Sequence, residues 1–323
     1  MEEHFSHYMQ VGIVSFAAFP DLGSGKGDVV AAMEMLADDP LFEQIDVTRV
    51  DDPAERRKAA SIAQSANMRV AFGAHPVILS ENLDLSSCDE GARTAAVKRL
   101  LPFIGEAVEW KAFAFVVLSG KDPGEASRDK ALDALVRSLI ELAAASRSQG
   151  GPTIVLETFD RVPFGKNCLV GPTDLAVQVA RKVRKSHPDF GLLLDLSHLP
   201  LLDEDPRQSL LRSKGLLSCV HIGNCIRKER YRGHPAYGDN HPPFGIPEGE
   251  NGVRELRDFL AALFEVGYLA AGRKPVVGFE LKPPAGMSVE ALLENARSTL
   301  GQAWAQLRVP GAIRKEPRGR RRV

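Results

Sequence analysis

The chain has 323 residues, of which 44% are hydrophobic and 26% are charged, with 41 Lys and Arg against 42 Asp and Glu. This composition is typical of a globular protein and excludes a disordered or fibrous chain, and the net charge of -1 gives no overall field that would attract DNA or an anionic membrane. The length allows one large α/β barrel or two smaller domains.

Segments of strand and helix character alternate along the whole sequence. Strand-like runs lie at 10–16, 44–50, 68–73, 112–118, 153–157, 190–194, 217–221 and 275–280. The helix-like runs that follow them lie at 27–36, 53–66, 92–107, 126–147, 173–185, 206–213, 253–266 and 289–306. Because such alternation produces parallel strands joined by helices, eight pairs predict a (β/α)₈ TIM barrel. A doubly wound sheet is the alternative, but it would not place polar residues so evenly at strand ends.

The barrel is expected to be a single domain over residues 1–309. Residues 310–323 are basic and lack any hydrophobic period, so a disordered tail is expected there. The four cysteines form no CxxC pair, which favours reduced thiols. The start resembles no secretory signal and no apolar run is long enough to span a bilayer, so we expect a cytoplasmic protein.

Four of the strand-like runs end in one ionisable residue each: Glu157, Asp195, His221 and Glu280. A carboxylate or imidazole at the end of a buried strand is costly unless it is paired, hydrogen-bonded or bound to a metal. A buried ion-pair network would need Lys or Arg partners, which these strands do not carry. The set therefore predicts one divalent metal ion. Its oxygen-rich chemistry suits manganese best, with magnesium, cobalt or zinc as alternatives.

Other polar residues follow the same strand ends. His75 comes after the third strand and could bind substrate or be a hydrogen-bonded structural histidine. His198 lies three residues after Asp195. His241 belongs to a long segment between the last two strands, 234–245, which is dense in turn-forming residues and typical of a lid or binding loop.

With these residues in place, the sequence resembles the xylose isomerase-like barrel superfamily, in particular its sugar isomerase and epimerase branch. The resemblance rests on Glu157, Asp195-x-x-His198, His221 with Arg227 six residues later, Gly238-Asp-x-His241 and Glu280. It implies that the four strand-end residues hold one divalent metal, while Glu157 and Glu280 also act as acid and base. It also implies that His198 and Arg227 hold substrate oxygens, and we add His75 to the substrate-binding residues. The implied reaction is proton transfer next to a sugar carbonyl through an enediolate.

One departure from the sugar epimerases leaves other reactions open. Pro163 stands where the sugar epimerases carry a substrate-binding carboxylate, six residues after the first Glu. A metal-dependent lyase or dehydratase acting on an oxidised sugar or oxo-glycoside is therefore an alternative, with His241 as the extra proton donor. A homo-oligomer is expected here, and a small second subunit is the alternative, because superfamily members such as the C-glycoside deglycosidases use the same metal set with such a subunit.

The superfamily also includes zinc endonucleases that cut DNA at abasic sites. His75 and Asp239-x-His241 resemble their additional zinc ligands. Those enzymes supply one more histidine from the end of the fourth strand, where residues 117–121 of this chain contain none. Together with the near-zero net charge, this makes a nucleic-acid substrate the less favoured reading. A non-catalytic sugar-binding protein is a further alternative, although it would need no acid–base pair.

Overall fold

The computed structural model describes residues 1 and 3–308, so the tail predicted at 310–323 lies outside the described residues. Its sheet is a closed barrel of parallel strands in chain order. The strands are β1 (Gln10–Val14), β2 (Gln44–Val47), β3 (Arg69–Gly73), β4 (Ala114–Val117), β5 (Thr153–Glu157), β6 (Gly191–Asp195), β7 (Leu217–Gly223) and β8 (Val276–Glu280). Pairing of β8 with β1 closes the ring. The predicted (β/α)₈ barrel is confirmed.

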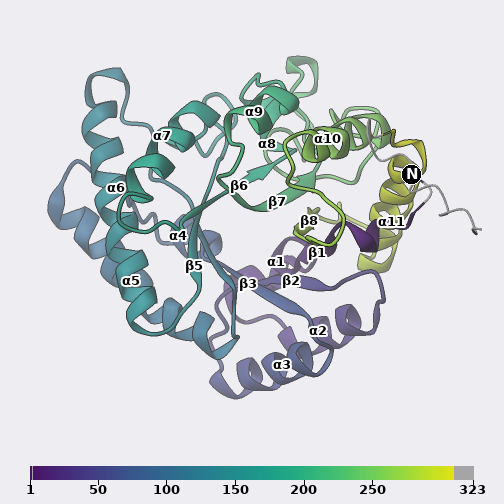
Figure 1. The fold of residues 1–323 in the computed structure, drawn as a ribbon, viewed down its shortest axis with the longest axis horizontal. Helices are drawn as coiled ribbons and strands as arrows, with labels where there is room; N and C mark the ends of the chain where they lie inside the picture. The colour runs from purple at the N-terminus through teal and green to yellow at the C-terminus, as the bar shows by residue number, and fades with distance from the viewer. Residues whose placement is uncertain (2, 309–323) are drawn as a thin grey trace, which may run out of the picture.

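A ring of helices surrounds the strands (Figure 1). It contains α2 (Val29–Asp38), α3 (Pro53–Ser65), α5 (Glu90–Glu109), α6 (Glu125–Ser148), α7 (Thr173–Val183), α9 (Pro206–Arg212), α10 (Val253–Glu265) and α11 (Val289–Gln306). Aspartate side chains accept hydrogen bonds from backbone N–H groups at the start of α2, α3, α5 and α9. Such caps satisfy backbone donors that have no partner inside the helix, which is why these helices begin where they do.

Six short elements were not predicted from the sequence. They are the helices α1 (Ser15–Ala18), α4 (His75–Ser80) and α8 (His198–Leu201), and the 3₁₀ helices η1 (Phe5–His7), η2 (Pro20–Ser24) and η3 (Glu229–Tyr231). One or two turns are too short to show a helical hydrophobic period, which explains why they were missed. Strand β2 also ends at Val47, three residues before the predicted end at 50. Among the described residues, no helix is long and apolar enough to cross a membrane.

Alternation along the strands separates two apolar cores. A small core fills the barrel interior and consists of Ala71, Ala114, Val116, Val155, Leu193 and Cys219. The larger core lies between the strands and the helices and includes Phe72 and Phe115, whose rings stack 5.3 Å apart. Glu157, Asp195 and His221 each follow a member of the interior set by two residues. Because strand side chains alternate between faces, these three point into the barrel at its carboxyl end.

The same alternation places two polar residues of β2 in the barrel interior. Ile45 and Val47 belong to the outer core, so Gln44 and Asp46 face inward. Gly12 of β1 is the register partner of Gln44, and a Cβ atom at Gly12 would lie 1.8 Å from the Gln44 side-chain oxygen. A glycine at this position therefore gives Gln44 the room to enter the barrel.

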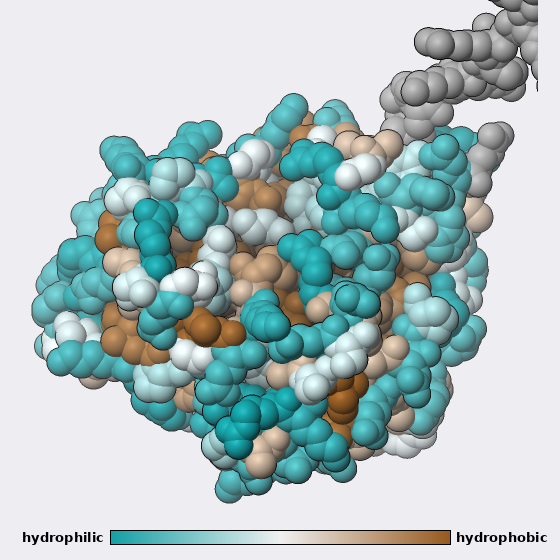
Figure 2. Space-filling view, turned by 60° about the horizontal axis from the view of Figure 1, so that its bottom comes forward, coloured by the Kyte–Doolittle hydropathy of each residue, from teal (hydrophilic) through white to brown (hydrophobic). Residues whose placement is uncertain are grey.

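The outer surface is largely polar. Hydrophilic residues dominate the face shown in Figure 2, and hydrophobic residues reach the surface in smaller areas between them. The large hydrophobic side chains that are most exposed among the described residues are Met35, Leu79 and Val162, which come from separate parts of the chain. Scattered apolar residues of this kind are ordinary on a globular protein.

Candidate metal centre and active site

The four predicted metal ligands meet at the carboxyl end of the barrel. One ligand atom from each of Glu157, Asp195, His221 and Glu280 lies within 4.8 Å of the other three. Two ligands that each lie about 2.1 Å from one ion are at most about 4.2 Å apart. The group therefore has nearly the dimensions of a metal site. That these residues bind a metal stays a prediction.

Unpaired oxygens support a cation at this point. Both carboxylate oxygens of Glu157 and Oδ2 of Asp195 are buried without a hydrogen-bond partner among the described residues. The three carboxylates of the group form ion pairs only with histidines, and no Lys or Arg of the described residues lies within ion-pair distance of them. Because orphaned buried acceptors are rare and costly, the donor set fits a divalent ion.

The electrostatics of the two acidic ligands differ. Burial raises the pKa of Asp195 above its ordinary value, and neighbouring histidines only partly oppose this effect. Burial would also raise the pKa of Glu280, but His241 and His221 outweigh it and hold that pKa well below the ordinary value. Burial therefore penalises the negative charge of Asp195, whereas the neighbouring histidines favour the negative charge of Glu280.

His221 is oriented by a residue that was not predicted. Its Nδ1 faces the cluster, 3.1 Å from Oε2 of Glu280, and its Nε2 donates to Oδ2 of Asp46 at 2.6 Å. The Gln44 amide in turn donates to Oδ1 of Asp46 at 2.6 Å. A carboxylate on the far nitrogen fixes the ring orientation and makes the near nitrogen a better ligand. The alternation in β2, with Ile45 and Val47 facing outward, was the signal that could have identified Asp46.

We expect Asp46→Ala to weaken metal binding by about 10–100-fold, as removal of such supporting groups generally does. The reason is that His221 would lose the acceptor that fixes its ring. Asp46→Asn is the matched control, because its amide oxygen can still accept from Nε2, so the loss should be smaller. Titration of the purified variants with Mn²⁺ or Zn²⁺ measures the effect. Wild-type affinity in Asp46→Ala would contradict this role.

A second polar group adjoins the predicted ligands. Oδ1 of Asp239 lies 3.1 Å from Nε2 of His198 and 2.8 Å from Nε2 of His241. The other ring nitrogen of His198 lies 2.6 Å from the Thr158 carbonyl oxygen. Burial would lower the pKa of His198, but Asp239 and Asp195 raise it to about 10. This raised pKa favours the imidazolium form of His198, in which one ring N–H donates to Asp239 and the other to the Thr158 carbonyl.

His241 connects the two groups. Its Nε2 lies 3.4 Å from Oε1 of Glu280, and its Nδ1 lies 3.2 Å from the Ser197 hydroxyl. The backbone of His241 has φ of 48°, a left-handed conformation that is uncommon for residues other than glycine. Such conformations persist where the surrounding structure demands them, and they concentrate at functional sites.

His75 also reaches the cluster, whereas Arg227 does not. His75 is the first residue of α4, and its Nε2 lies 2.9 Å from Oε2 of Glu157 without the geometry of a hydrogen bond. Arg227 pairs with Asp203 and Glu250 in a neighbouring groove of about 590 Å³. The predicted role of Arg227 as a substrate-binding residue stays a prediction.

Two loops meet beside the cluster. The loop after β5 and the loop after β7 touch where the rings of Phe164 and Tyr237 lie 5.8 Å apart. The ammonium group of Lys166, also in the loop after β5, pairs with Asp239. Sequence reasoning missed Lys166 because it lies in the middle of an irregular loop, where no period or strand end marks a residue as functional.

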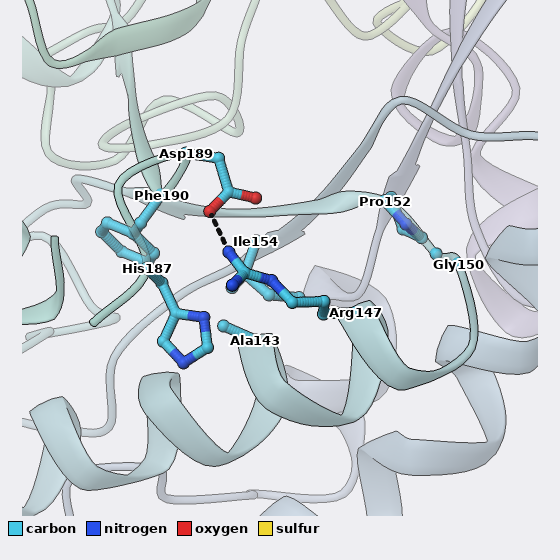
Figure 3. A pocket seen from close by; sticks show the side chains of 9 residues that line it. Ala143, Arg147, Gly150, Pro152, Ile154, His187, Asp189 and Phe190 are labelled. Atoms are coloured by element: carbon cyan, nitrogen blue, oxygen red, sulfur yellow. Dashed lines mark hydrogen bonds and ion pairs between the residues drawn. The ribbon is translucent and has the colours of Figure 1, made fainter.

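A separate cavity of about 240 Å³ lies at the opposite end of the barrel, beside the amino ends of β5 and β6 (Figure 3). Arg147 and Asp189 form an ion pair of 3.1 Å there, close to His187. The cavity contains none of the predicted site residues. The ionisable groups of the barrel mouth are therefore the better candidates for chemistry.

Comparison with known families and structures agrees with this fold. The model of the xylose isomerase-like TIM barrel family matches residues 30–297. No curated protein matches the sequence.

Several solved structures share the fold. A D-psicose 3-epimerase from Clostridium cellulolyticum H10 is 17% identical with a TM-score of 0.64, covering 92% of this chain and 99% of that one. A zinc-bound IolI protein is 16% identical with a TM-score of 0.66, covering 93% and 99%. A family 2 AP endonuclease from Brucella melitensis is 17% identical with a TM-score of 0.61, covering 90% and 98%.

Proposed function

Because the chain belongs to the xylose isomerase-like TIM barrel family, we propose that it is a sugar isomerase or epimerase that depends on one divalent metal ion. The observation that carries this proposal is the group of four ligand-type side chains at the barrel mouth. Several similar structures are described as sugar 3-epimerases, which supports a carbohydrate substrate. Fold alone does not define a reaction, so the reaction has to follow from the side chains at the barrel mouth.

The proposed metal ligands are Glu157, Asp195, His221 and Glu280. Three carboxylates and one imidazole favour a hard ion, so we propose manganese first and magnesium, cobalt or zinc as alternatives. Zinc is included among the alternatives because one similar structure is described as containing a bound zinc atom. When bound, the ion would supply positive charge that stabilises the enediolate oxygens of the substrate.

The proposed acid and base are Glu157 and Glu280. They end β5 and β8, which lie in different parts of the barrel wall, and both contribute an oxygen to the same small group. One carboxylate would remove the proton next to the carbonyl, and the other would return a proton. Return to the opposite face gives epimerisation, and return to the neighbouring carbon gives isomerisation.

The proposed substrate-binding residues are His198 and His75, which adjoin the four proposed metal ligands, and Arg227, which lies in the neighbouring groove. Both ring nitrogens of His198 are already engaged, by the Thr158 carbonyl and by Asp239, so we propose that His198 acts on a substrate oxygen through its positive charge. His75 lies between the rings of Phe16 and Phe159, at centroid distances of 6.3 Å and 5.5 Å. These aromatic residues give the site an apolar wall against which a sugar ring can pack. Arg227 would contact only a substituent that extends into its groove.

Solvent-deuterium exchange tests the proposal. The protein would be incubated with a panel of ketoses, inososes and oxo-glycosides in D₂O with Mn²⁺ present, and deuterium at the carbon beside the carbonyl would be followed by NMR. We expect incorporation into at least one sugar and loss of incorporation in EDTA. Tight binding of a sugar without any exchange would identify a binding protein instead.

A lyase of the same family is the second candidate, because His241 can protonate a leaving group from its position 3.4 Å from Glu280. If the protein is a lyase, His241→Ala should retain deuterium exchange but lose elimination, since only the leaving group needs that proton. If it is an epimerase or isomerase, the variant should retain both exchange and product formation. Loss of exchange itself would contradict the role assigned to His241 and make it a base or a metal ligand.

A further inference from the structure

The ammonium group of Lys166 is unusual in its position. It comes from the loop after β5 and reaches across to Asp239 in the loop after β7. It also lies over the ring of Phe159, with Nζ 4.7 Å from the ring centroid. Burial would lower the pKa of Lys166, but Asp239 outweighs it and raises that pKa above its ordinary value. Lys166 is therefore a fixed positive charge at the barrel mouth.

The partner of Lys166 belongs to a second group with the chemistry of a metal site. Ligand-type atoms of Asp195, His198 and His241 lie within 4.8 Å of one another. Asp239 joins them, because its Oδ1 contacts Nε2 of both histidines. Two imidazoles and two carboxylates are a suitable donor set for a divalent transition metal. All four side chains are buried.

Lys166 competes with a cation for this group. Its ammonium occupies Oδ2 of Asp239, so one of the two oxygens is already engaged. A fixed positive charge also repels a second cation, and this repulsion is strong inside a protein because water screens it poorly. The same pairing joins the two loops that meet beside the cluster.

We propose that Lys166 is an internal cation that takes the place of a second metal ion beside Asp239, His198 and His241, so that the barrel mouth binds a single divalent ion. This inference rests on the metal centre of the proposed function. One ion is sufficient to stabilise the charge of an enediolate, so a single-ion site is compatible with the proposed carbonyl chemistry.

Metal stoichiometry tests the role of Lys166. Wild-type protein and Lys166→Met would be incubated with excess Zn²⁺, desalted, and analysed by inductively coupled plasma mass spectrometry. We expect about one ion per wild-type chain and about two per Lys166→Met chain, because the histidines and Asp239 become available as ligands. The double variant Lys166→Met/Asp239→Asn should return to about one.

Two control variants accompany this experiment. Lys166→Arg keeps the positive charge and should remain at the wild-type stoichiometry. Lys121→Met removes an exposed lysine from the neighbouring loop after β4 and should also leave the stoichiometry unchanged. Circular dichroism would check that each variant is folded.

The outcomes separate this inference from the proposed function. One ion in both wild type and Lys166→Met would overturn the role of Lys166 and leave the metal centre intact. Two ions in wild type would also overturn it, and this measurement does not depend on how any variant folds. If wild type binds no metal, the proposed metal centre fails and the inference fails with it.

Discussion

Glu157→Gln is expected to slow solvent-deuterium exchange by about 10²–10⁴-fold, the usual contribution of a positioned acid or base. The side chain is only 1% exposed, and both of its oxygens lack hydrogen-bond partners among the described residues. With no hydrogen bond to engage them, these oxygens are available to accept a substrate proton. Gln has nearly the same shape but cannot accept a proton at neutral pH, so the substitution removes the chemistry and leaves the packing in place.

The experiment must separate proton transfer from metal loss, because Glu157 is also a proposed ligand. Exchange should therefore be measured at saturating Mn²⁺, with the metal content of each sample determined in parallel. Glu43→Gln is a matched control: Glu43 pairs with Lys274 beside the amino ends of β2 and β8, at the opposite end of the barrel from the site. We expect wild-type exchange in this control. Wild-type exchange in metal-loaded Glu157→Gln would exclude Glu157 as acid or base.

Much of this site could be predicted from the sequence, because a parallel barrel places the carboxyl ends of its strands close together. Glu157, Asp195 and His221 are far apart in sequence, yet each ends an apolar run that β-pairing brings to one rim. The strand-like and helix-like runs can be recognised in short segments of the sequence, and their number and order were enough to predict the barrel. Because active sites of such barrels lie at the carboxyl ends of the strands, the polar residue at each strand end could then be identified as a candidate site residue.

Residues that reach the site only through tertiary contacts could not be predicted from the sequence. Asp46 lies within a strand and supports His221 from 175 residues away in the sequence. Lys166 reaches the site only because two irregular loops touch, and loop conformation has no hydrophobic period to reveal it. The spacing of Arg227 from His221 predicted a substrate-binding role, but it could not predict the ion pairs of its guanidinium with Asp203 and Glu250. That role stays a prediction.

Asp195→Asn and Glu280→Gln are expected to reduce metal affinity by more than the loss predicted for Asp46→Ala, because each removes a direct ligand charge. Asp195 is the cleaner of the two substitutions. It has no proposed role in proton transfer, it is fully buried, and its Oδ1 already accepts from the backbone N–H of Ser197 at 2.7 Å. Asn can keep that hydrogen bond while it removes the negative charge from Oδ2.

Thermal unfolding gives a readout that does not require a known substrate. Metal that binds only the folded state stabilises it by about 2.7 kcal/mol when the free ion is at 100 times its Kd. Wild-type protein should therefore unfold at a higher temperature in Mn²⁺ than in EDTA, whereas Asp195→Asn should show little difference. In EDTA the variant should be at least as stable as wild type, because burial penalises the charge of Asp195 and raises its pKa. Equal metal-induced shifts in wild type and both ligand variants would show that the ion binds elsewhere.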